Sequence, residues 1–103
     1  MIRHIVLFSA NNPRDIDRIH QALSKLKAIP HARHLEVCRN AKKDDLSREI
    51  DLVVYAEFDD YDQLERYKAH PLYDESVALV RPLRDVRIVV DFEAEAQRAD
   101  NAG

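Results

Sequence analysis

The sequence predicts a single α+β domain in which the elements follow one another as β-α-β-β-α-β, with the strands in one four-stranded antiparallel sheet. The chain has 103 residues, which is the size of one domain. Hydrophobic residues make up 46% and charged residues 34% of the chain, a balance typical of a compact soluble fold. Segments with a hydrophobic period of two residues alternate with segments of helical period, and this alternation gives the order of the elements.

The first strand is expected over residues 3–9. Hydrophobic side chains occur on both of its faces, with His4, Val6 and Phe8 on one face and Ile5 and Leu7 on the other. A strand with this pattern needs to be covered on both sides, because leaving either set in water forfeits the free energy of hydrophobic burial.

A helix is expected to begin at residues 12–15 and to end at Pro30. The segment Asn-Pro-Arg-Asp offers a favoured N-cap, a proline at the first helical position and an acidic residue in the first turn. Four hydrophobic residues then follow at helical spacing: Ile16, Ile19, Leu23 and Leu26.

Two further strands are expected over residues 34–40 and 50–58, joined by a charged connecting loop at 41–48. Along the second of these strands, successive side chains alternate clearly between two faces. One of its faces carries Leu52, Val54, Ala56 and Phe58, and the other carries Val53 and Tyr55.

A second helical region is expected from Asp60, because residues 60–63 resemble a capping box. His70 precedes Pro71, and a residue before proline is disfavoured in the helical conformation, so we expect a break there and a second helix over 72–80. The last strand is expected over 86–92. The remaining residues are small, charged and aperiodic, which predicts a domain over residues 1–92 and a disordered tail over 93–103.

The order β-α-β-β-α-β is that of the ferredoxin-like fold, in which the helices cover only one face of the sheet. Ile5, Leu7, Val53 and Tyr55 then have no cover within the chain. At roughly 25 cal/mol per Å² of apolar surface, their exposure would cost several kcal/mol. An exposed apolar face of this kind usually marks an interface. We therefore expect a homodimer in which two copies meet through the sheet face.

The composition excludes several functional classes. The only glycine is Gly103, so the glycine-rich loops of nucleotide and dinucleotide sites are missing and no cofactor is expected. A net charge of −3 argues against nucleic-acid or anionic-membrane partners, and the strand at 51–58 lacks the Lys/Arg-Gly pair of RNA-recognition domains. The single cysteine, Cys38, cannot form an internal disulfide, and no apolar run is long enough for a signal or a membrane span. We expect a cytoplasmic location.

The pair His31 and His34 could suggest a metal site. In a loop that enters a strand, positions three apart point to opposite faces, and no cysteine or carboxylate set lies nearby in the sequence. We expect no metal site.

Several segments together resemble the stress-responsive A/B barrel (Dabb) family. They are Arg3-His4-Ile5-Val6-Leu7-Phe8 at the start, then Tyr55-Ala56-Glu57-Phe58, Leu64 with Tyr67, His70-Pro71, and Val89-Val90-Asp91-Phe92. The resemblance covers roughly residues 2 to 92. It implies a dimeric α+β barrel, in which two ferredoxin-like subunits pack their sheets together.

The resemblance also implies a site between the sheet and the helices. In members of the family that close an aromatic ring without a cofactor, a tyrosine and a histidine carry the chemistry. Here Tyr67 matches the tyrosine, Tyr73 stands in the place of the histidine, and His4 matches another histidine of the pocket. These three are the catalytic candidates. The expected ligand-binding residues are His4, Val6, Leu52, Val54, Phe58, Tyr67, His70 and Tyr73.

Two functions fit this sequence. The first is a small-molecule binding protein for an apolar oxygenated compound, acting as a carrier or as an enzyme without a cofactor. The alternative is a stress-protective or structural dimer without turnover. In this pocket we expect burial to lower the pKa of His4, so that the ring is neutral and serves as a hydrogen-bond partner or a weak base.

Overall fold

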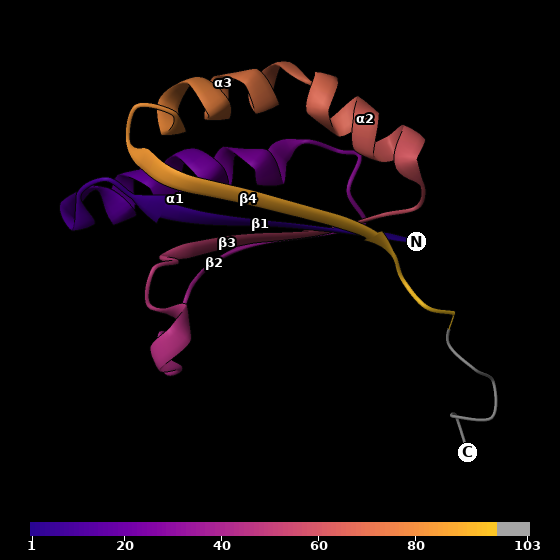
Figure 1. Ribbon diagram of the computed structural model, residues 1–103. Coiled ribbons are helices and arrows are strands. Elements are labelled where there is room, and N and C mark those ends of the chain that lie inside the picture. The colour runs from indigo at the N-terminus through magenta and orange to yellow at the C-terminus, as the bar shows by residue number, and fades with distance from the viewer. Residues whose placement is uncertain (97–103) are drawn as a thin grey trace.

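The computed structural model describes residues 1–96, which form a four-stranded sheet with all the α-helices on one face (Figure 1). The order of elements is the expected β-α-β-β-α-β, with the second helical region divided in two. The elements are β1 (Ile2–Ala10), α1 (Ile16–Ser24), β2 (His34–Arg39), β3 (Leu52–Phe58), α2 (Tyr61–Ala69), α3 (Pro71–Val80) and β4 (Arg84–Glu93).

The strands lie in the order β2-β3-β1-β4, and every neighbouring pair is antiparallel. The predicted ferredoxin-like fold is therefore confirmed. The strand boundaries differ slightly from expectation: β3 begins two residues later than predicted, and β4 is longer at both ends. Central β1 alternates between buried and half-buried residues, since its inner face packs against the helices.

The expected first helix consists of three parts. A 3₁₀ turn at Pro13–Asp15 is capped by Asn12, whose side chain accepts a hydrogen bond from the backbone N–H of Arg14. The α1 helix follows and ends in a second 3₁₀ segment, Lys25–Ala28. The hydrophobic residues spaced along this region (Ile19, Leu23 and Leu26) are buried against the sheet, as their spacing predicts.

His70 separates the second helical region into α2 and α3. Its extended backbone ends α2, and its Nδ1 accepts a hydrogen bond of 3.1 Å from the backbone N–H of Leu72. His70 is thus the N-cap of α3, with Pro71 at the first helical position. At the start of α2, Asp60 accepts a hydrogen bond from the N–H of Gln63, as the capping pattern predicts.

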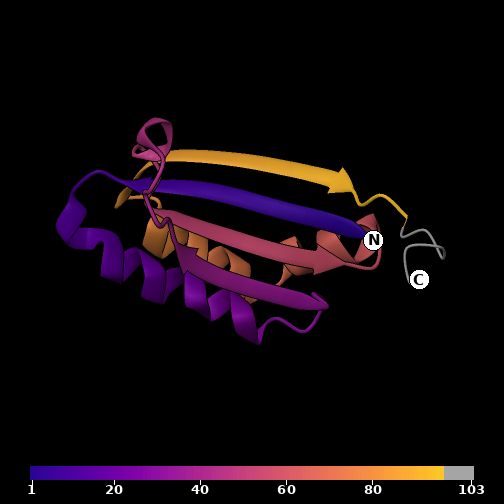
Figure 2. The ribbon, with the colours of Figure 1, turned by 90° about the horizontal axis from the view of Figure 1, so that it is seen from below.

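Among the described residues, no α-helix covers the other face of the sheet, and the loop between β2 and β3, with its short 3₁₀ turn Asp45–Ser47, projects on that side (Figure 1 and Figure 2). The register places Ile5 between Tyr55 and Val90, and Leu7 between Val53 and Ile88. The β4 strand is at the edge of the sheet, and its residues on this open face are markedly exposed: Ile88 and Val90 at 48% each and Phe92 at 40%. These residues extend the apolar surface that the sequence predicts on β1 and β3.

The strand β4 runs to Glu93, the first residue of the expected tail, and the chain is described to residue 96. The rest of that tail lies outside the described residues. Within residues 1–96, no helix has the length and hydropathy needed to cross a bilayer.

Candidate functional site

A cavity of about 360 Å³ lies between the helix-covered face of the sheet and α3. Its inner end is formed by His4 of β1 together with Tyr67 of α2 and Tyr73 of α3. Apolar walls come from the sheet, from α1 with the 3₁₀ segment that follows it, and from α3, and they include Val6, Val54, Leu23, Leu26, Val77 and Val80. Apolar walls with a few polar groups are typical of a small-molecule site.

The cavity lies beside the edge strand. On the central strand β1 the helix-facing side chains are buried, whereas the corresponding residues of β4, Arg87 and Val89, are exposed. The helical layer therefore leaves the inner side of β4 accessible beside the cavity.

His4 is 1% exposed and its Nδ1 is hydrogen bonded to the carboxylate of Asp91. The two residues are directly opposite each other in the pairing of β1 with β4. With the Nδ1 proton donated to the carboxylate, Nε2 of the neutral ring carries a lone pair and is the acceptor or base. Asp91 fixes both the tautomer and the orientation of the ring.

Two aromatic rings pack together against the same side of the His4 ring. The ring of Phe58 lies 6.2 Å from that of His4 and the ring of Tyr67 lies 6.1 Å from it, both in edge-to-face geometry. Phe58 and Tyr67 also contact each other, with ring centroids 5.0 Å apart. Such edge-to-face contacts stabilise one orientation of the imidazole.

Burial lowers the pKa of His4 below its usual 6.5, as the sequence predicts. Desolvation is the largest cause, and it outweighs the hydrogen bond and the negative charge of Asp91, which raise the pKa. The positive charges of Lys68 and Arg87 lower it further. The histidine is therefore neutral at pH 7, which is the form that can accept a proton.

The two tyrosines continue the line of aromatic rings away from His4. The rings of Tyr67 and Tyr73 are 5.3 Å apart, and Arg87 donates a long hydrogen bond of 3.4 Å to the hydroxyl of Tyr73. Burial raises the pKa of Tyr67 far above that of a free phenol, so its hydroxyl stays protonated. Tyr67 can therefore donate a hydrogen bond to a ligand oxygen, while His4 accepts one.

The structure brings together five of the eight expected ligand-binding residues around the cavity: His4, Val6, Val54, Tyr67 and Tyr73. The other three lie elsewhere. Leu52 and Phe58 are fully buried in the core beneath the helices, and Phe58 supports the ring of His4 from the side. His70 caps α3 and is not among the residues that line the cavity.

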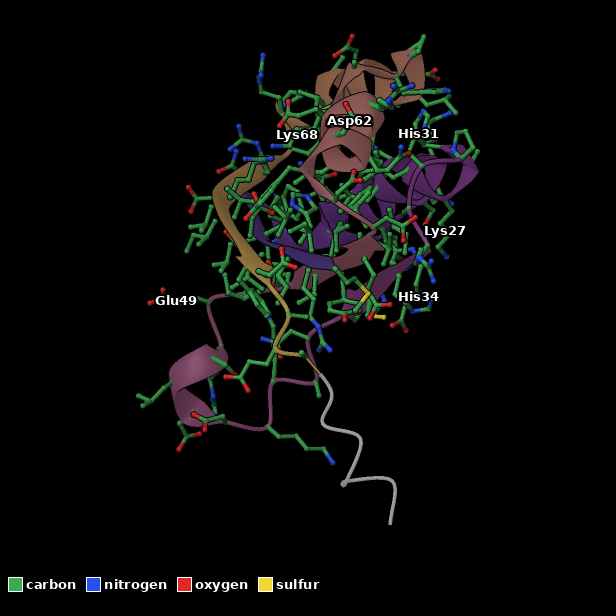
Figure 3. The ribbon with its side chains drawn as sticks, turned by 90° about the vertical axis from the view of Figure 1, so that its right-hand side faces the viewer. Lys27, His31, His34, Glu49, Asp62 and Lys68 are labelled. Atoms are coloured by element: carbon green, nitrogen blue, oxygen red, sulfur yellow. The ribbon has the colours of Figure 1, made fainter. Side chains whose placement is uncertain are left out.

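The two histidines of the suspected metal pair have separate partners. His31 lies beside the helices, where its Nδ1 is 3.3 Å from the side-chain oxygen of Gln63, and His34 lies lower, on the sheet (Figure 3). His34 pairs with Glu36 at 2.8 Å. Among residues 1–96, no group of three or more His, Cys, Asp or Glu side chains is arranged to hold a metal ion.

Sequence reasoning missed Asp91 as a site residue. The signal was a single carboxylate within the apolar run 86–92, on the face opposite Val90. It also missed three arginines that line the cavity, Arg81, Arg84 and Arg87. Their positions depend on strand pairing, which the local pattern does not specify.

The lowered pKa of His4 predicts a specific pH dependence of stability. In the unfolded chain the histidine binds a proton near pH 6.5, whereas in the folded chain it does so only at lower pH. The unfolding free energy should therefore be constant above about pH 7 and should fall as the pH drops from 6.5 toward the pKa of the folded state. Urea unfolding of the wild type and of His4→Gln, at matched protein concentrations, measures this slope. A His4→Gln variant with the same slope as the wild type would show that His4 is not the group responsible.

Residues 2–94 match the model of the Stress responsive A/B Barrel Domain (Dabb). A dimeric ferredoxin-like protein of unknown function from Thermobifida fusca is 30% identical, with a TM-score of 0.77 and coverage of 90% of each chain. A Dabb family protein from Mesorhizobium loti is 25% identical, with a TM-score of 0.71 and coverage of 92% of this chain and 97% of that one.

A more distant structure shares the fold. A dimeric protein of unknown function with a ferredoxin-like fold from Bacteroides fragilis is 22% identical, with a TM-score of 0.76 and coverage of 90% of this chain and 95% of that one. No curated protein matches the sequence significantly. Because the family model spans residues 2–94, the chain belongs to the stress-responsive A/B barrel (Dabb) domain family.

Proposed function

We propose that this protein binds a small, largely apolar oxygenated molecule in the cavity between the sheet and α3, and that His4 acts on it without a cofactor. The observation that carries the proposal is the His4–Asp91 pair beside an apolar cavity. The buried Nδ1 of His4 needs a hydrogen-bond partner in any role, and the carboxylate that partners it leaves Nε2 as the acceptor of the ring. The pairing holds the ring in the tautomer that a base requires.

The chemistry that fits this arrangement is proton transfer at a carbonyl or phenol ligand. Nε2 of His4 would accept a proton from an acidic C–H or O–H of the ligand. The protonated hydroxyl of Tyr67 would donate a hydrogen bond to the oxygen on which negative charge develops. Tyr73, next to Tyr67 and in contact with Arg87, would hold the hydroxyl-bearing side of the ligand. Asp91 is a positioning residue in this scheme, because it acts through His4.

A ligand screen with matched variants tests the proposal. Phenols, aldehydes and short polyketide mimics would be tested by thermal shift against the wild type, His4→Ala and Tyr67→Phe. We expect at least one ligand to raise the melting temperature of the wild type, and both variants to reduce that rise. Loss of a hydrogen bond to a ligand weakens binding by about 0.5–1.5 kcal/mol, which is up to about tenfold.

His20→Ala is the control for this screen. His20 is a half-buried histidine of α1 whose Nε2 lies 3.2 Å from the carbonyl oxygen of Val37, and it does not line the cavity. The ligand shift of His20→Ala should equal that of the wild type. Ligand shifts that His4→Ala and Tyr67→Phe leave unchanged would reject the cavity as the binding site and favour a structural dimer without turnover.

We also propose that the protein is a homodimer built through the open face of the sheet. The support is the exposed apolar surface of β1, β3 and β4 and the dimeric description of the protein from Thermobifida fusca. The hydroxyl of Tyr55 on this face already donates a hydrogen bond of 2.6 Å to Glu57. A second copy could therefore cover the ring of Tyr55 without leaving its hydroxyl unpaired.

A further inference from the structure

Three arginine side chains line the cavity, and one of them, Arg87, reaches the hydroxyl of Tyr73. Arg81 lies at the end of α3, and Arg84 and Arg87 come from the first half of β4. Among the described residues that line the cavity, the one carboxylate is Asp74. This part of the cavity therefore has an excess of positive charge, which neither the packing nor the proposed chemistry of His4 requires.

An irregularity in the sheet puts two of these arginines on the same side. Arg87 lies opposite Phe8 and Arg84 lies opposite Ala10, so three steps along β4 correspond to two steps along β1. The pairing is shifted there by a β-bulge, and the hydroxyl of Ser9 accepts a hydrogen bond of 2.9 Å from the N–H of Val86. Residues three apart in a regular strand point to opposite faces, whereas here Arg84 and Arg87 both line the cavity.

These three guanidinium groups form no ion pair with any residue from 1 to 96. Arg33, Arg39 and Arg66, in contrast, each pair with an aspartate on the surface. The charge of Arg87 reaches the inner end of the cavity, because it lowers the pKa of both His4 and Tyr67. The arginines thus form a positive region that the single carboxylate of Asp74 balances only in part and that is continuous with the site of His4.

We propose that the ligand is an apolar acid whose carboxylate binds Arg84 and Arg87, with Arg81 adding to the positive field. This inference rests on the proposed function and adds the chemical class of the ligand. A guanidinium group binds a carboxylate through two parallel hydrogen bonds, and such charge-assisted bonds are stronger than neutral ones.

The charge of Asp91 sets the direction of binding. Its negative charge repels the carboxylate of the ligand from the inner end of the cavity. The apolar, oxygen-bearing end of the ligand therefore faces His4 and Tyr67, and the carboxylate of the ligand faces the start of β4. A cavity of about 360 Å³ is near the lower limit for small-molecule sites, which favours an acid with one or two rings.

Fluorescence titration with hydroxynaphthoic acid and its primary amide tests this inference. The two probes have nearly the same shape and differ in charge. At neutral pH the wild type should bind the acid at least about tenfold more tightly than the amide. Arg84→Gln and Arg87→Gln should each remove most of this preference and leave the affinity for the amide within about twofold.

Arg14→Gln is the control, because it makes the same change in net charge at an exposed residue that does not line the cavity. It should keep the preference of the wild type. Equal binding of acid and amide to the wild type would overturn the inference. So would a preference that Arg84→Gln and Arg87→Gln leave intact, whether or not the melting temperature falls.

The same titration separates this inference from the proposed function. Binding of the amide that depends on His4, without any preference for the acid, would overturn the carboxylate class and leave the proposed function standing. Failure of both probes to bind the wild type would count against both.

Discussion

Val90→Lys should dissociate the homodimer, weakening the association by at least about 100-fold, which corresponds to about 2.7 kcal/mol. Val90 is 48% exposed on the open face of the sheet, next to Ile5 in the pairing of β1 with β4. In a two-fold symmetric interface the substitution occurs twice, so two ammonium groups would lose water with no partner of opposite charge. Val53→Lys, on β3 of the same face, should have the same effect.

Val89→Lys is the matched control. Val89 is the neighbouring residue on the same strand, has the same side chain and a similar exposure of 42%, but lies on the opposite face, in register with Val6. Analytical ultracentrifugation at micromolar concentration should give a mass near twice 12.0 kDa for the wild type and Val89→Lys, and near 12.0 kDa for Val90→Lys. A wild type that sediments as a monomer, or a Val90→Lys variant as dimeric as Val89→Lys, would reject the proposed interface.

Phe58→Ala should lower the free energy of unfolding by about 3–5 kcal/mol, since it leaves a void in a closely packed core. Phe58 is 0% exposed and contacts the rings of both His4 and Tyr67. The loss should also affect the site. Water that enters the void would reduce the desolvation that lowers the pKa of His4, so this pKa should rise toward 6.5.

Phe58→Leu is the conservative comparison, and it should have a much smaller effect on both quantities because it retains most of the buried volume. Chemical unfolding at one fixed protein concentration measures the first quantity, since a dimer's stability depends on concentration. A pH titration of the His4 ring by NMR measures the second. A Phe58→Ala variant with the His4 pKa of the wild type would show that Phe58 contributes to stability alone.

The order of the elements could be predicted because it depends on local periodicity. The alternation around Val6 and Val54 gives the inner faces of β1 and β3, and His70-Pro71 gives the break between α2 and α3. The same patterns predict the open face of the sheet, on which Ile5 and Val53 lie. The edge strand β4 adds exposed apolar side chains to this face, whereas the sequence pattern predicts such side chains only on β1 and β3.

The site could be predicted only in part, because it depends on contacts between distant segments. Alternation shows that Leu52 and Phe58 face the helices, but not that the helices pack directly onto them and exclude them from the cavity. The partner of His4 is set by the register of β4 on β1, which brings Asp91 opposite it. The convergence of Arg84 and Arg87 depends on a bulge, which no local pattern indicates.

The most direct test of the account is the nitrogen NMR signal of the His4 ring, measured with and without a bound ligand at neutral pH. We predict that the free protein shows a neutral ring protonated at Nδ1, and that saturation with hydroxynaphthoic acid shifts the Nε2 signal while Nδ1 stays protonated. The signals of His20, which lies away from the cavity, should not move. An Nε2 signal of His4 that is unchanged at saturation, or a ring protonated at Nε2 in the free protein, would contradict the role assigned to the His4–Asp91 pair.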